Sequence, residues 1–201
     1  MQLKFFGCNF LFLAEYKKHK YEILLPLFFI GAFANAQVSN VVRHPDSYKN
    51  FPYEGTRIIQ VDEVNSPDNE DNVFIFSKIE KGAKPDKMTF QRFTKVDGNW
   101  KVVAKKQMTH DGILSAWGQR KAFADYDKDK SIDALFIYAL NDYDLKQQSV
   151  HLIFSKKDKL YEISTSAESG YTKDIYSDNF KTLPENIQSK ILEYWNKLDK
   201  E

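Results

Sequence analysis

The sequence predicts a mainly β (α+β) fold, either an antiparallel β-meander or two packed sheets, with one C-terminal helix. Segments rich in β-branched and aromatic residues recur between residues 56 and 166, and polar turns separate them. The Asp-Gly pair at residues 97–98 lies between two such segments, which is typical of a β-hairpin. Apolar residues recur at helical spacing near the end of the chain. With 42% hydrophobic and 15% aromatic residues, the chain can bury a packed core.

The charges of the chain are nearly balanced. Its 29 basic and 28 acidic residues are well mixed and leave a net charge of +1. The sequence has no basic stripe of the kind that binds nucleic acid and no acidic tail for a charged partner. We therefore expect no nucleic-acid partner.

Residues 1–36 have the pattern of a secretory signal peptide. A basic cluster at residues 17–20 precedes an apolar run at residues 23–34, and the small-residue motif "ANA" ends at Ala36. The run is shorter than the roughly 20 residues that span a bilayer. The apolar stretch before the basic cluster does not fit such a leader, so we expect an over-extended start. We predict export to the periplasm or cell surface, no transmembrane span in the mature chain, and a single β-rich domain over residues 37–201.

The mature chain is expected to begin with an irregular lead-in and to continue as a series of strands. The Asp-Gly hairpin joins two of them. Residues 134–140 are apolar on both faces, which predicts a central strand covered on both sides. The remaining predicted strands cover residues 56–64, 72–80, 149–155 and 159–166.

The C-terminal helix is predicted over residues 183–198. Thr182 is expected to be its N-cap, with Glu185 three residues later and Pro184 in the first turn. Its polar face is not notably basic, so docking on a sheet is favoured over binding to a membrane surface. One helical face is apolar and consists of Ile187, Ile191, Trp195 and Leu198.

An acidic run before the central strand is the candidate metal site. Its four aspartates occupy positions 1, 3, 5 and 9 of a loop: Asp125, Asp127, Asp129 and Asp133. Calcium takes six to eight hard oxygen ligands, and alternate carboxylates can supply several. An EF-hand is excluded because position 12 is Phe136 and strands flank the loop. The run instead resembles the D-x-D-x-D-G-x-x-D calcium loop of β-propeller repeats.

Two lysines oppose calcium binding in this loop. Lys130 stands where the loop needs a residue with φ > 0, usually glycine, and this costs about 1 kcal/mol. Lys128 and Lys130 also place positive charge beside the carboxylates. The alternatives are a weak calcium site and an Asp-rich turn closed by side-chain-to-backbone hydrogen bonds. The sequence favours the turn.

No catalytic or cofactor-binding residues are predicted. The histidines at positions 44, 110 and 151 lack metal-ligand spacing, and His110 with Asp111 forms a loop pair without a nucleophile nearby in the sequence. The only cysteine, Cys8, lies in the leader. Aromatic side chains that could stack on a sugar are more typical of a core; they are Trp117, Tyr126, Tyr138 and Tyr143.

Four stretches together resemble a family of small exported bacterial proteins described as surface polysaccharide (lipopolysaccharide) biosynthesis proteins. They are "YEGTRIIQV", "FADYDKDKSIDALFIYAL", "VHLIFSKKDKLYEIS" and "SDNFKTLPENIQSKILEYWNKL". The family pattern has an acidic loop before a strand and an F-x-x-x-P helix that ends in an aromatic-Trp pair. These match residues 125–133, Phe180 with Pro184, and Tyr194 with Trp195. Lys130 departs from the family glycine.

This resemblance implies an association with cell-surface glycan but no reaction. The expected function is that of an exported, non-enzymatic protein in surface polysaccharide biosynthesis or cell-envelope maintenance, with a glycan or envelope protein as partner. The alternatives are a calcium-dependent glycan- or protein-binding module and, least favoured, a cell-envelope hydrolase.

Overall fold

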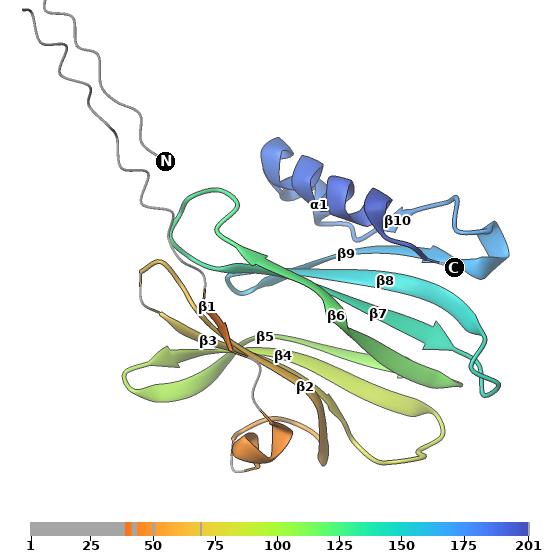
Figure 1. Ribbon diagram of the computed structural model, residues 1–201, viewed down its shortest axis with the longest axis horizontal. Helices are drawn as coiled ribbons and strands as arrows, with labels where there is room; N and C mark the ends of the chain where they lie inside the picture. Colours follow the sequence, from red (N-terminus) through yellow and green to blue (C-terminus); the bar gives the residue numbers. More distant parts are fainter. Residues whose placement is uncertain (1–38, 42–43, 50, 69, 201) are drawn as a thin grey trace, which may run out of the picture. The chain divides into compact units, whose positions relative to one another are not determined.

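The computed structural model describes residues 39–41, 44–49, 51–68 and 70–200, and the signal peptide predicted over residues 1–36 lies outside them. Two five-stranded antiparallel sheets follow each other along the chain, and neighbouring strands in each are neighbours in sequence (Figure 1). Sheet A contains β1 (Ser39–Val41), β2 (Arg57–Asn65), β3 (Asp71–Lys78), β4 (Asp86–Val96) and β5 (Asn99–His110). Sheet B contains β6 (Ile113–Ala124), β7 (Asp133–Asn141), β8 (Gln147–Lys156), β9 (Lys159–Ser166) and β10 (Ile175–Tyr176). The predicted mainly β fold with two packed sheets is confirmed.

Phenylalanines from both sheets form the interior between them. Phe136 of β7 lies with its ring centroid 5.4 Å from that of Phe74, 5.5 Å from Phe76 and 5.3 Å from Phe90. Each of these side chains is at most 1% exposed. Because β7 also faces the helix with its other side, the predicted central strand is confirmed.

Strand β6 crosses the inner face of sheet A, and no strand was predicted over its residues. Near its start, Leu114 N donates to Asp86 Oδ2 of β4 at 2.9 Å. Towards its end, Lys121 pairs with the buried Asp62 of β2. The pairing of β6 with β7 is irregular between Ala116 and Lys121, and this bulge breaks the two-residue alternation that marks a strand in sequence.

The C-terminal helix α1 (Glu185–Lys197) covers the outer face of sheet B (Figure 1). The predicted apolar face is confirmed, because Ile187, Ile191 and Trp195 are buried against β7 and β8. Trp195 Nε1 also donates to Asp174 Oδ1 at 2.9 Å. No described helix is both long enough and apolar enough to cross a membrane.

The predicted helix start is wrong. Thr182 is not the N-cap: it ends the 3-10 turn η3 (Phe180–Thr182), and its Oγ1 donates to Asn179 O at 2.7 Å. Leu183 and Pro184 are extended, with ψ of 145° and 142°. Because proline disfavours a helical conformation at the residue before it, the helix begins only after Pro184.

The lead-in covers the outer face of sheet A. Tyr48, at the end of the 3-10 turn η1 (Pro45–Tyr48), packs with Phe51 against Phe93 of β4. Tyr48 OH donates to Glu63 Oε2 of β2 at 2.9 Å. The predicted irregular lead-in thus contains β1 and η1, and a further 3-10 turn, η2 (Ala167–Ser169), follows β9.

Candidate functional site

The acidic loop joins β6 to β7 and is closed by its own carboxylates. The carboxylate of Asp125 accepts hydrogen bonds from Asp129 N and Lys130 N, both at 2.9 Å. Asp129 Oδ1 accepts one from Ser131 N at 2.9 Å. Lys128 and Lys130 have φ of 62° and 69°, so the predicted left-handed turn at Lys130 is confirmed. These are the side-chain-to-backbone bonds of an Asp-rich turn.

Three of the four predicted metal ligands lie together. Asp125, Asp127 and Asp129 each offer a carboxylate oxygen, and these atoms lie within 4.8 Å of one another. Asp133 is not in this group: it is fully buried, and its Oδ2 accepts from Tyr126 N at 3.3 Å. The loop therefore gathers three ligands for a cation and turns the fourth into the core.

A lysine of the neighbouring hairpin supplies positive charge at this cluster. Lys156 Nζ lies 2.7 Å from Asp127 Oδ2, 3.1 Å from Asp129 Oδ2 and 3.6 Å from Asp133 Oδ1. Lys157 Nζ lies 3.0 Å from Asp129 Oδ2. Sequence reasoning had assigned the neutralising charge to two lysines of the loop. Among the described residues, the ion pairs with these carboxylates come instead from Lys156 and Lys157 of the β8–β9 hairpin.

The environment separates the pKa values of two loop aspartates. Burial opposes ionisation of Asp129, but Lys157, the Ser131 N–H and Lys156 outweigh it and lower the pKa of Asp129 to about 2. Burial raises the pKa of Asp133 to about 6, although Lys156 and the Tyr126 N–H act against it. At neutral pH, Asp129 is firmly ionised, whereas Asp133 titrates just below neutrality.

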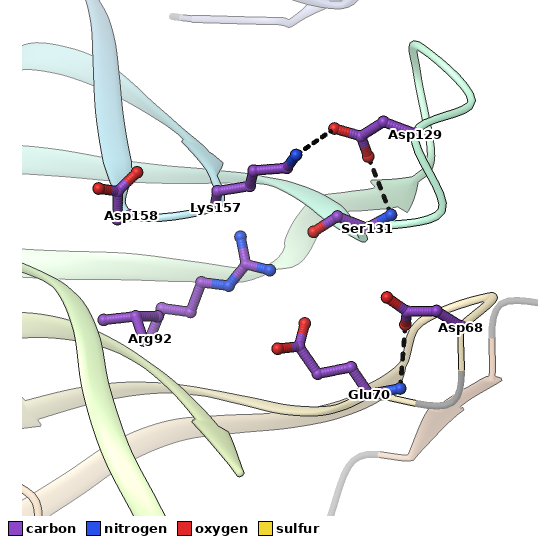
Figure 2. Close-up of a pocket in the computed structure, with 8 residues that line it drawn as sticks. Asp68, Glu70, Arg92, Asp129, Ser131, Lys157 and Asp158 are labelled. Atoms are coloured by element: carbon purple, nitrogen blue, oxygen red, sulfur yellow. Dashed lines mark hydrogen bonds and ion pairs between the residues drawn. The ribbon is translucent and has the colours of Figure 1, made fainter. Parts of the chain in front are cut away.

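A pocket of about 340 Å³ adjoins the loop at this end of the two sheets (Figure 2). Three connections contribute to it: the β2–β3 turn, the acidic loop and the β8–β9 hairpin. It is predominantly charged and is lined by Asp68, Glu70, Arg92, Val103, Asp129, Ser131, Lys157 and Asp158. The acidic loop thus forms one wall of a larger site.

Arg92 is the buried cation of this pocket, and Figure 2 shows its guanidinium pointing into the space between the labelled side chains. Arg92 as a whole is only 1% exposed. Nε and Nη2 donate to Asn72 Oδ1 at 3.2 and 2.9 Å. Nη1 is buried and has no hydrogen-bond partner among the described residues. Burial lowers the pKa of Arg92, but nearby carboxylates, Glu70 foremost, oppose this, and arginine stays charged in proteins.

A buried network fixes the position of Arg92. Asn72 Nδ2 donates to Ser66 Oγ at 2.8 Å, and Ser66 Oγ also accepts from Ile132 N at 3.2 Å. The network therefore ties Arg92 on β4 to the end of the acidic loop, across the two sheets. Arg92 was missed from the sequence. One feature of the sequence could have indicated it. Arg92 follows Phe90 by two residues, so it lies on the same inward-facing side of β4, where an apolar residue is expected.

The weaker sequence candidates have structural roles. His151 stacks on Tyr138 at 4.7 Å between ring centroids, and burial lowers its pKa to about 4. His110 Nε2 lies 2.9 Å from Asn141 O, and Asp111 accepts from Tyr143 OH, so His110 and Asp111 have separate partners. Trp117 and Tyr126 pack against the core beneath α1, as expected of structural aromatics.

A second pocket, of about 270 Å³, is lined by residues that include Arg57, Lys84 and Tyr143. It shares no lining residue with the Arg92 pocket. Comparisons with protein families, with curated proteins and with solved structures give no match.

Proposed function

We propose that this protein is an exported, non-enzymatic binding module that supports the assembly or maintenance of surface polysaccharide, and that it holds its ligand in the Arg92 pocket. The observation that carries the proposal is the unpaired, buried Nη1 of Arg92. A buried donor without an acceptor costs about 1–3 kcal/mol, and more when it is charged. A ligand that offers an acceptor recovers this free energy on binding.

The two loop aspartates with shifted pKa values do not suit the role of a hydrolase's general acid. A glycoside hydrolase uses two carboxyl groups, one of which stays protonated near neutral pH to act as the general acid. Asp129 faces the pocket, but its pKa of about 2 keeps it ionised. Asp133 has a suitable pKa of about 6 but is fully buried. These two aspartates therefore do not supply the acid of a hydrolase.

A calcium-dependent binding module is the second candidate function. It is favoured by the cluster of Asp125, Asp127 and Asp129, because Asp129 also lines the pocket. A cation in this cluster would thus act directly on the ligand site. It would compete with Lys156, whose ammonium already contacts Asp127 and Asp129.

The function is tested at two levels. Deletion of the gene should reduce or change surface polysaccharide, and the exported protein should begin at Gln37. Purified protein should bind polysaccharide extracted from the same cells, as measured by calorimetry. Unaltered polysaccharide after deletion, together with no binding by the purified protein, would overturn the proposal.

The Arg92 pocket is tested with matched arginine variants. Arg92→Lys keeps the positive charge but loses the planar fork, so binding should fall at least tenfold. Arg57→Lys makes the same change at the second pocket and should leave binding unchanged. Thermal melts show whether each variant is folded. Equal binding by parent and a folded Arg92→Lys protein would place the ligand elsewhere.

A further inference from the structure

We infer that the Arg92 pocket selects a neutral, polyhydroxylated ligand and rejects an acidic one. This inference rests on the proposed function and deepens it by giving the chemical class of the glycan that binds. Three properties of the pocket carry it: its charge balance, its hydrogen-bonding capacity and the rigidity of its polar groups.

The pocket has more negative than positive charge although an arginine lies at its centre. Four carboxylates line it, from Asp68, Glu70, Asp129 and Asp158, against the cations of Arg92 and Lys157. The ammonium of Lys157 is already engaged, 3.0 Å from Asp129 Oδ2. Nearby carboxylates also act on Arg92 itself and stabilise its charge. An acidic ligand would therefore meet like charges, which oppose binding at close range.

The hydrogen-bonding groups of the pocket are of opposite kinds. Arg92 Nη1 can only donate, whereas the ionised carboxylates can only accept. A hydroxyl group does both, so neighbouring hydroxyls on one sugar ring can accept from Nη1 and donate to Glu70 or Asp158. A carboxylate-bearing ligand could satisfy Nη1 but would offer no donor to the acidic wall at that position. The pocket therefore matches a neutral sugar better than a uronic acid.

The polar groups are held in place before any ligand binds. Asn72 fixes two nitrogens of Arg92, and the bonds of Ser66 fix Asn72. Ser131 N and Lys157 hold the two oxygens of Asp129 (Figure 2). Binding therefore orders few side chains, and this preorganisation favours affinity. The volume of about 340 Å³ lies at the lower end of the range of small-ligand sites, which suits a short stretch of glycan.

The inference is tested with two trisaccharides of the same linkage, one of glucose and one of glucuronic acid. They differ only in carrying a hydroxymethyl group or a carboxylate on each ring. Calorimetry on the full mature protein should show at least tenfold tighter binding of the glucose trisaccharide at low salt. The difference should narrow as salt screens the repulsion. Arg92→Lys should weaken glucose binding at least tenfold, and Arg57→Lys should not.

A double variant separates charge from shape. Glu70→Gln with Asp158→Asn removes two negative charges at nearly unchanged volume, so glucuronate binding should strengthen relative to glucose binding. Equal or tighter binding of the glucuronate trisaccharide by the parent would overturn the inference and leave the binding function standing. If neither trisaccharide binds, the neutral-sugar inference fails; binding of the extracted polysaccharide then decides separately whether the proposed function survives.

Discussion

Lys156 Nζ lies 2.7 Å from Asp127 Oδ2, although Lys156 ends β8 and Asp127 lies in the loop between β6 and β7. The same ammonium also lies 3.1 Å from Asp129 Oδ2. A cation fixed to the protein therefore contacts two of the three clustered carboxylates that could hold a metal ion. This relationship determines what the loop contributes to stability and how it should respond to calcium.

Lys156→Met should destabilise the protein and make its stability depend on calcium. The Lys156 side chain is 15% exposed, and removal of one partner from a buried ion pair costs about 3–5 kcal/mol. Calcium can then take the place of the ammonium; at about 100 times its Kd it would restore about 2.7 kcal/mol. Thermal melts in calcium and in chelator measure both effects.

Lys157→Met is the matched control for this change. Its side chain is 57% exposed and pairs with the same Asp129, so its loss should cost no more than about 1 kcal/mol. If Lys156→Met and the parent have the same melting temperature in chelator, Lys156 is not the internal cation of the loop.

Lys130→Gly should stabilise the loop and make it a better calcium ligand than the parent loop. The φ of 69° at Lys130 disfavours any residue with a Cβ by about 1–2 kcal/mol, and glycine also removes a positive charge. Lys130→Ala removes the charge but keeps the strain, so the glycine variant should be the more stable of the two. Chemical denaturation compares their stabilities, and calorimetric titration compares their calcium affinities. An alanine variant as stable as the glycine variant would contradict the predicted strain.

Asp133→Asn should remove a pH dependence of stability below neutrality. Because the pKa of Asp133 rises from 3.8 to about 6 on folding, the folded state retains a proton that the unfolded state has released. Stability therefore falls as the pH rises through this window, by about 3 kcal/mol for this group. Relative to the parent, the asparagine variant should gain stability between about pH 4 and pH 7.

Asp129 is the control for Asp133, because its contribution to stability depends on pH in the opposite direction. The pKa of Asp129 falls to about 2 on folding, so its contribution is present above 3.8 and is lost as the pH falls through 2. Asp129→Asn should thus alter the parent's acid unfolding below pH 4. Denaturation at a series of pH values distinguishes the two; a gain by Asp133→Asn only below pH 4 would contradict the burial argument.

Trp195→Ala should destabilise the whole domain. Trp195 is fully buried at the contact between α1 and sheet B, and truncation of such a side chain costs about 3–5 kcal/mol. Trp195→Phe keeps an aromatic ring but loses the bond to Asp174, so it should cost less. Chemical denaturation measures both. An alanine variant with the parent's stability would mean that α1 does not hold sheet B together.

Most of the fold could be predicted because its strands keep a regular pattern. Residues 56–64 and 72–80 are rich in β-branched and aromatic residues and are bounded by polar turns, and they correspond to β2 and β3. Strand β6 was not predicted because the bulge after Ala116 breaks the alternation of apolar and polar residues. The start of α1 was predicted too early. Pro184 disfavours a helical conformation at Leu183, and this effect outweighs the capping motif at Thr182.

The candidate site could be predicted only where it is local in sequence. The spacing of the acidic loop indicated its clustered carboxylates and the left-handed Lys130. The partners of the loop come from distant segments: Lys156 lies 27 positions from Asp129, and Arg92 belongs to the other sheet. Which distant side chains meet depends on how the two sheets stack, and periodicity within a strand does not encode this.

The covering of sheet B by the last helix has a consequence for the growing polypeptide. Sheet A needs no residue beyond His110, so its strand pairings can form early in synthesis. Sheet B, by contrast, keeps Leu135, Ile137 and Leu152 uncovered until α1 has emerged, because these side chains pack in the cluster that α1 completes. A nascent chain halted before residue 185 would therefore present an apolar surface on which chaperones or other chains can bind. Emergence of α1 is the step that covers this surface.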